Sequence, residues 1–200
     1  LYNSSVSACT LGAGLGDNGL QVAAAGSGCW LAQLPASGAD IRLWGVIGAA
    51  DDTALAQAAD TAMGSASWPT GVAKALIIPN ATVNLLNWAP TKVQRISGVN
   101  RDTSILNLAA VGGTADWLVE YLGAGPLWVD NLTLQCPLSD PVTRAISAGT
   151  NGLRVGAGSG STVQSSFVSV RHVKTIGCQV GLRFVGVQYL DMEDIFNDRP

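Results

Sequence analysis

The sequence is poor in charged residues and in histidine. Charged residues make up 12% of its 200 positions, about half the usual quarter of a globular chain, and the one histidine is His172. The formal net charge of −3, with 11 Lys and Arg residues, argues against nucleic acids and anionic membranes as partners. Catalysis of the Ser-His-Asp or Cys-His type would have to use His172.

Long apolar runs are also missing, which predicts that the chain is not inserted into a membrane. No charged segment followed by an apolar run and a cleavage site marks a signal peptide. The sequence starts at Leu1 and stops at Pro200 without a closing element. We therefore expect a fragment of a longer polypeptide.

Cysteines are few, and they lie far apart. None of the four forms a C-x-x-C pair, so we expect no zinc site and predict no metal and no cofactor. Buried free thiols are the simplest expectation. A Cys9–Cys29 disulfide is the alternative that the spacing leaves open.

Hydrophobic residues make up 48% of the chain, and the length suits one large domain or two small ones. Residues 1–39 are rich in Gly, Ala and Ser and predict a small β-rich segment. Residues 54–63 predict the one helix, with Leu55, Ala58, Ala59 and Ala62 on one face. Asp51 and Asp52 precede it, where carboxylates accept backbone N–H groups.

Short β-strands are predicted elsewhere. A strand is expected at residues 41–46, and the apolar run at 75–78 is typical of a strand buried on both faces. Further short strands are expected at 83–88, 93–96 and 104–108.

Weak internal repeats occur in the last third of the sequence. Asn151-Gly-Leu-Arg-Val155 is repeated as Val180-Gly-Leu-Arg-Phe184. Val129-Asp-Asn-Leu132, Val170-Arg-His-Val173 and Met192-Glu-Asp-Ile195 share an apolar-polar-polar-apolar form. Their spacings of 41 and 22 residues fit two coils and one coil of a parallel solenoid, with Ile78, Val129, Val170 and Met192 stacked along its axis. An antiparallel sandwich is the alternative.

Three segments carry a family resemblance. Residues 43–59, which include Asp51-Asp-Thr53, resemble the opening motif of the pectate-lyase-like right-handed β-helix superfamily. Residues 75–83 and 96–106 look like the next two elements of that superfamily. The resemblance covers roughly residues 40–200. The family's G-D-G-x-x-D-D segment is shortened here, and its I-P-x-G-x-Y turn lacks the Gly and the Tyr.

Within the superfamily, the sequence is most similar to bacteriophage tailspike and tail fibre proteins, because Gly28-Cys-Trp30 and Leu31 resemble a segment that precedes their opening motif. The resemblance implies a mostly β chain. Residues 1–39 would be a virion-proximal adaptor, and residues 40–200 would be a capping helix with the first coils of a right-handed parallel β-helix. It also implies a homotrimer in the phage tail, outside the cell, with tail or baseplate proteins and bacterial surface polysaccharide as partners.

Asp191 and Glu193 are the candidate catalytic residues. In a strand, side chains at i and i+2 share a face and lie about 6.5–7 Å apart at Cα. That separation suits the paired carboxylates of a glycoside hydrolase, and an ordinary solvated strand face is the alternative. Asp130 is expected on an equivalent coil.

Arg154, Arg183, Trp117 and Trp128 are the candidate substrate-binding residues. The two arginines occupy equivalent places in a repeat and would bind an acidic sugar, or else form a subunit contact. Tryptophan rings pack against sugar faces, although they serve as core or interface anchors more often. Trp44 is predicted to be buried, and His172 to be a surface or corner residue.

The sequence therefore predicts a tailspike or tail fibre component that attaches to the phage tail and binds bacterial polysaccharide, with Asp191 and Glu193 as the residues that would degrade it. A secreted polysaccharide lyase or glycoside hydrolase of the same fold is one alternative. A non-enzymatic fibre or baseplate protein is the other.

Overall fold

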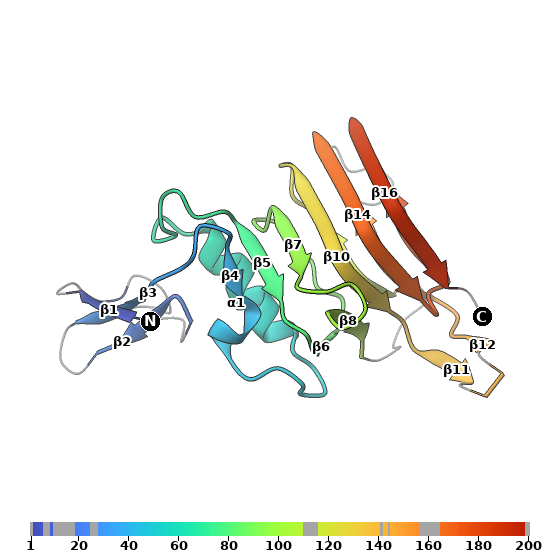
Figure 1. Ribbon diagram of the computed structural model, residues 1–200, viewed down its shortest axis with the longest axis horizontal. Helices are drawn as coiled ribbons and strands as arrows, with labels where there is room; N and C mark the ends of the chain where they lie inside the picture. The colour runs from blue at the N-terminus through green and yellow to red at the C-terminus, as the bar shows by residue number, and fades with distance from the viewer. Residues whose placement is uncertain are drawn as a thin grey trace.

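The computed structural model describes residues 2–5, 9, 19–24, 28–109, 116–140, 142–143, 145–156 and 165–198. These residues form a mostly β molecule that contains one α-helix (Figure 1). A small sheet lies at one end, the helix follows, and parallel strands lie side by side beyond it. No helix of the described residues is long and apolar enough to cross a membrane.

The small sheet is antiparallel. It consists of β1 (Tyr2–Ser5), β2 (Gln21–Ala23) and β3 (Cys29–Ala32), with β3 in the middle. Leu20 and Ala32 belong to the same apolar core as Ile41 and Trp44. This N-terminal segment therefore packs against the rest of the chain.

The expectation of free thiols is wrong. Cys9 is bonded to Cys29, and Cys136 is bonded to Cys178. The members of the second pair are 42 residues apart and meet because neighbouring parallel strands place their ends together. The sequence allowed a Cys9–Cys29 disulfide as an alternative, but it gave no indication of the Cys136–Cys178 disulfide.

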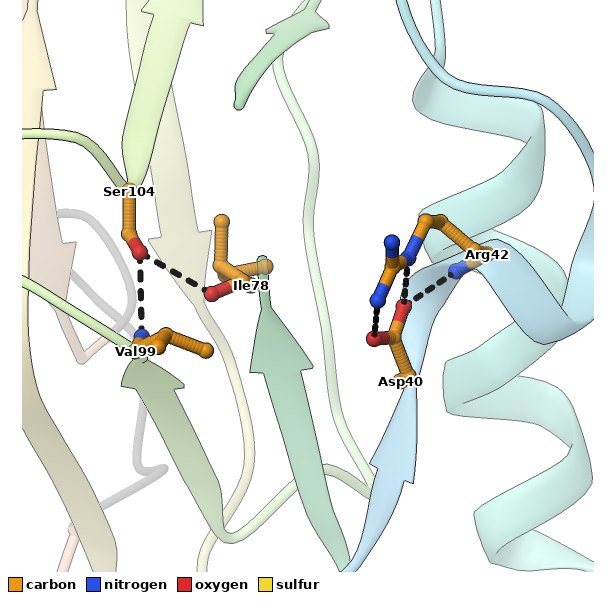
Figure 2. A network of polar contacts seen from close by, with 5 residues as sticks. All are labelled: Asp40, Arg42, Ile78, Val99 and Ser104. Carbon is orange, nitrogen blue, oxygen red and sulfur yellow. Dashed lines mark hydrogen bonds and ion pairs between the residues drawn. The ribbon is translucent and has the colours of Figure 1, made fainter. Parts of the chain in front are cut away.

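The strand expected at residues 41–46 is also wrong. The chain forms β4 (Ala39–Asp40) and then a 3-10 helix, η2 (Ile41–Trp44). The Asp40 carboxylate accepts hydrogen bonds from the Arg42 backbone N–H and guanidinium, which closes this turn (Figure 2). Trp44 is buried as predicted.

Helix α1 (Thr53–Gly64) confirms the predicted helix, but its buried face is displaced by one position. Ala56, Ala59, Ala62 and Met63 are buried, whereas Leu55 and Ala58 are only partly buried. Asp60 lies on the buried face because its carboxylate accepts the backbone N–H groups of residues 91–93. The helix lies at the β4 end of the parallel strands (Figure 1).

Both aspartates before α1 accept backbone N–H groups. Asp51 accepts from Thr53 at the helix start. Buried Asp52 makes no such bond within the helix, and its carboxylate accepts from Gly48, Ala49 and Asn84 instead. Asp52 therefore ties the loop before α1 to the sheet.

The main sheet is parallel and curled. Its neighbours in order are β16 (Tyr189–Asp198), β14 (Phe167–Ile176), β10 (Leu127–Gln135), β7 (Arg95–Gly98), β5 (Ala75–Ile78) and β4. A branch of β6 (Thr82–Leu85) and β8 (Ile105–Leu108) pairs with the second half of β10. A separate parallel sheet holds β9 (Asp116–Tyr121), β13 (Thr150–Val155) and β15 (Val180–Phe184).

Apolar side chains stack in register through the core. One row runs through Leu76, Ile96, Val129, Val170 and Met192. The expected row therefore exists, but Leu76 stands in it rather than Ile78, which lies opposite Gly98. The antiparallel sandwich is wrong for this sheet, since every strand pair in it is parallel.

Three long strands bend at one shared position. Asn131, His172 and Asp194 have φ angles of 58°, 51° and 49°, in the left-handed region that bends the backbone. One such residue shifts the period-two alternation by one position, so apolar residues on both sides of the bend point inward. This explains the apolar-polar-polar-apolar form of the three repeated segments.

The 41-residue spacing is one step between neighbouring strands, not two coils. Val129 lies directly opposite Val170. The extra length includes a hairpin of β11 (Leu138–Asp140) and β12 (Ala145–Ile146), which projects beyond the parallel strands (Figure 1). The repeat at residues 151 and 180 is confirmed, because β13 and β15 pair with Leu153 opposite Leu182.

Buried Ser104 links three segments near the bend. Its hydroxyl donates to the Ile78 carbonyl and accepts from the Val99 backbone N–H at 3.0 Å (Figure 2). The molecule as a whole is mostly β with a curled parallel sheet, which is consistent with part of a parallel β-helix.

Candidate functional site

The outward face of the main sheet carries two rows of polar and aromatic side chains. One row holds Arg95, Trp128, Ser169 and Asp191, and the next holds Ser97, Asp130, Arg171 and Glu193. Successive side chains of a strand point to opposite faces. The buried residues Val129 and Val170 therefore leave the residues beside them facing outward.

Ion pairs connect these rows across the strands. Arg171 contacts Asp191 at 2.6 Å and Glu193 at 3.6 Å. Arg95 Nε lies 2.8 Å from Asp130 Oδ2. Ser169 donates a hydrogen bond to Asp191, and Ser97 donates one to Asp130. The face is thus covered by alternating, mutually paired charges.

A hollow of about 350 Å³ lies over these residues. Trp128 is 39% exposed, and its ring centroid lies 5.8 Å from that of Phe167 in a tilted arrangement. Tyr189, opposite Phe167 on the next strand, is 70% exposed. The hollow is lined by Arg95, Trp128, Val129, Asp130, Phe167, Ser169, Arg171, His172 and Asp191.

The hydrogen bond from Arg171 lowers the pKa of Asp191, and the bond from Ser169 acts in the same direction. The same pairing raises the pKa of Arg171. Asp191 is therefore an ionised hydrogen-bond acceptor near neutral pH rather than a proton donor. Its chemistry suits orienting hydroxyl groups of a ligand, or acting as a base or nucleophile.

The two candidate catalytic residues lie on one face and share one arginine. Asp191 lines the hollow, whereas Glu193 lies two residues further along β16 and is not among the lining residues. Asp130 lies beside them as expected, opposite Arg171. Their role in catalysis stays a prediction.

The candidate binding residues fall on two different sheets. Trp128 lies in the hollow, but Trp117, Arg154 and Arg183 lie on the sheet of β9, β13 and β15. Arg154 is opposite Arg183, pairs with Glu120 at 3.0 Å, and lies 5.9 Å from the centroid of Trp117. Trp117 is only 6% exposed, so its ring faces protein atoms in this chain.

Six residues of the outward face were not predicted from the sequence: Arg95, Ser97, Phe167, Ser169, Arg171 and Tyr189. The repeated segments contain a signal for one of them. Aligning Val129-Asp-Asn-Leu132 with Val170-Arg-His-Val173 and Met192-Glu-Asp-Ile195 places Arg171 between Asp130 and Glu193. No comparable repeat marks the aromatic pair.

His172 is an exposed corner residue, as predicted. It lies where the first hollow meets a smaller polar one lined also by Arg101, Asn131 and Asp194. Arg101 pairs with Asp194 at 2.9 Å. Within the described ranges no group of three or more His, Cys, Asp and Glu residues is arranged to hold a metal ion.

No protein-family model matches the sequence, and no curated protein matches it significantly. Solved structures do match. The chain superposes on the crystal structure of the enzymatically active domain of tailspike protein 2 from bacteriophage CBA120 with a TM-score of 0.72 at 17% identity, covering 98% of this chain and 28% of that one.

Full-length tailspike protein 2 from an Escherichia coli O157:H7 bacteriophage gives a TM-score of 0.71 at 17% identity, with 98% of this chain and 25% of that chain covered. The chain thus spans roughly a quarter of each tailspike that it matches. At this identity the likeness concerns the fold, and the chain has a tailspike-like fold.

Proposed function

We propose that this chain is part of a phage tailspike or tail fibre protein, and that the outward face around Trp128 binds bacterial surface polysaccharide. The tailspike-like fold supports the first statement. The second depends on the chemistry of the hollow described above.

The observation that carries the proposal is an exposed aromatic ring beside paired charges. The face of an indole ring packs against the apolar C–H face of a pyranose. Carboxylate oxygens accept hydrogen bonds from sugar hydroxyls, and guanidinium groups donate to hydroxyl and ring oxygens. Trp128, Arg171 and Asp191 supply all three groups within one hollow. Because their charges are paired, little electrostatic cost opposes binding of a neutral hydroxyl-rich ligand.

In the whole protein, we propose that the curled sheet is the start of a right-handed parallel β-helix whose further coils pack on β16. Leu190 and Met192 lie opposite the fully buried Val168 and Val170, yet they are 44% and 52% exposed. A further coil would cover both side chains. The proposed assembly is a homotrimer on the virion tail, outside the cell, where it contacts other tail or baseplate proteins.

Trimer formation is supported by the exposed apolar side chains Val46 and Leu86, which are 91% and 36% exposed. Light scattering on the protein should give the mass of three chains. A monomer would favour the alternative of a secreted enzyme instead.

The second activity that we propose for this face is degradation of the polysaccharide by Asp191 and Glu193. Cleavage by an inverting hydrolase needs one proton donor and one base. Ionised Asp191 suits the base, and Glu193 is the second carboxylate of the predicted pair. Asp191→Asn should then abolish the release of reducing ends while leaving the protein folded. Unchanged release would assign any cleavage to other residues of the whole protein.

Binding is tested with purified bacterial surface polysaccharides and two matched tryptophan variants. Trp128→Ala should lower the affinity by roughly 10-fold or more, since one aromatic contact is worth about 0.5–1.5 kcal/mol beyond the buried area. Trp30→Ala is the control, because Trp30 has similar exposure, 41%, and lies on β3. Equal loss in both variants, or no binding by the protein, would contradict the proposed site. A fibre that serves only as a rod would show no binding.

A further inference from the structure

Apart from the polar hollow beside Arg101, a second hollow continues the Trp128 hollow along the outward face. It has a volume of about 270 Å³ and is lined by Ala73, Lys74, Gln94, Arg95 and Trp128. Arg95 and Trp128 line both hollows. A ligand that packs on Trp128 in the first hollow would therefore extend directly into the second.

The two hollows differ in their charge. The first contains Asp130 and Asp191 beside its arginines, whereas the lining of the second includes two cations and no carboxylate. Arg95 uses Nε for Asp130, and its two terminal nitrogens are not used in that contact. Among the described residues, Lys74 has no ion pair within 4 Å.

Backbone hydrogen bonds hold residues 74 and 95, whose side chains line the same hollow, next to one another. The Lys74 carbonyl accepts hydrogen bonds from the N–H groups of Gln94, at 2.8 Å, and Arg95, at 3.1 Å. Arg95 also lies directly opposite Trp128 in the strand register. Lys74, Arg95 and the indole ring thus meet at the start of strands β5, β7 and β10, with the Gln94 amide beside them.

We infer that the Lys74–Arg95 hollow binds the carboxylate of a hexuronic acid residue, next to the sugar that packs on Trp128. An ammonium and a guanidinium at one site bind a carboxylate through charge-assisted hydrogen bonds, which are shorter and stronger than neutral ones. This inference rests on the proposed function and names the chemical class of glycan that the face recognises.

The test uses bacterial oligosaccharides that contain hexuronic acid, each paired with its carboxyl-reduced form, in which the carboxylate has become a primary alcohol. Affinity is measured by titration calorimetry for the protein and for the Lys74→Gln and Lys74→Arg variants. We expect carboxyl reduction and Lys74→Gln each to weaken binding about 10-fold or more, as for a hydrogen bond to a charged group. Lys74→Arg should retain most of the affinity, and binding should weaken at high salt.

Two outcomes separate the two claims. If native and reduced oligosaccharides bind equally and Lys74→Gln changes neither affinity, the carboxylate site is overturned while the glycan-binding function stands. If neither form binds and no other surface polysaccharide binds either, the proposed function is overturned, and this inference with it.

Discussion

Arg171 on β14 donates hydrogen bonds to the Asp191 carboxylate on β16, and the same guanidinium lies 3.6 Å from Glu193. Both carboxylates predicted to be catalytic are therefore held by one cation. The pairing lowers the pKa of Asp191, so its stabilising contribution is complete above the unfolded-state value of about 3.9 and is lost as the pH falls below that value.

Arg171→Leu should raise the pKa of Asp191 toward its ordinary value, because the main cause of the lowered pKa is removed. Titration of the carboxylate carbons by ¹³C NMR measures this change. Arg183→Leu is the matched control, since Arg183 is also exposed but lies on β15, in another sheet. An unchanged Asp191 pKa in Arg171→Leu would show that the two groups are not paired in solution.

Asn131 should be sensitive to substitution because it does two things at the bend of β10. Its φ is 58°, and its side-chain amide donates to the carbonyls of Gly98 and Val99. Asn131→Gly loses the two hydrogen bonds but tolerates the positive φ. Asn131→Ala loses the same hydrogen bonds and also strains the backbone at that φ. We expect Asn131→Ala to cost about 1–3 kcal/mol of unfolding free energy, and Asn131→Gly to cost less. Urea unfolding measures both, and equal stability of Asn131→Ala and the parent protein would be inconsistent with the bend.

Tyr121 should remain un-ionised well above pH 10. Burial raises its pKa to about 12, and the nearby Asp60 carboxylate adds to the shift. A raised folded-state pKa gives stability that is complete below the unfolded-state value of about 10 and decreases as the pH rises toward 12. The Tm should therefore fall between pH 10 and pH 12, and Tyr121→Phe should reduce that fall. Ultraviolet difference titration that shows three tyrosines ionising together near pH 10 would oppose this prediction.

The Cys136–Cys178 bond should contribute about 2–4 kcal/mol to the unfolding free energy, as expected for a closed loop of this size. To measure this bond without the Cys9–Cys29 bond, the Cys9→Ser/Cys29→Ser variant is used as the parent protein. In that variant, dithiothreitol should lower the Tm, and adding Cys136→Ala and Cys178→Ala should make the Tm independent of reductant. A parent protein that shows two free thiols without reductant would contradict the pairing.

Repeated residues predicted the parallel pairing of the last strands well. Val129, Val170 and Met192 are opposite one another because each repeat has one outward polar residue and one bent residue between two inward apolar ones. The sequence could not show that the first interval is a single step, since the β11–β12 hairpin lengthens the chain without adding a strand to the stack.

The candidate site was only partly predictable. Asp191 was identified from its i/i+2 spacing with Glu193, and Trp128 because tryptophan rings pack against sugar faces. Arg95 and Phe167 were missed because they enter the site through pairing with strands 33 and 22 residues away, namely Arg95 with Trp128 and Phe167 with Tyr189. The second disulfide was missed for the same reason, since only strand register brings Cys136 to Cys178.

The most direct measurement is a crystal structure of the protein soaked with an oligosaccharide of a bacterial surface polysaccharide that it binds. Our account predicts a pyranose ring packed on the exposed face of Trp128, with its hydroxyls in hydrogen-bond contact with Arg171 or Asp191. A sugar bound only at another surface, with the face of β10, β14 and β16 empty, would contradict it.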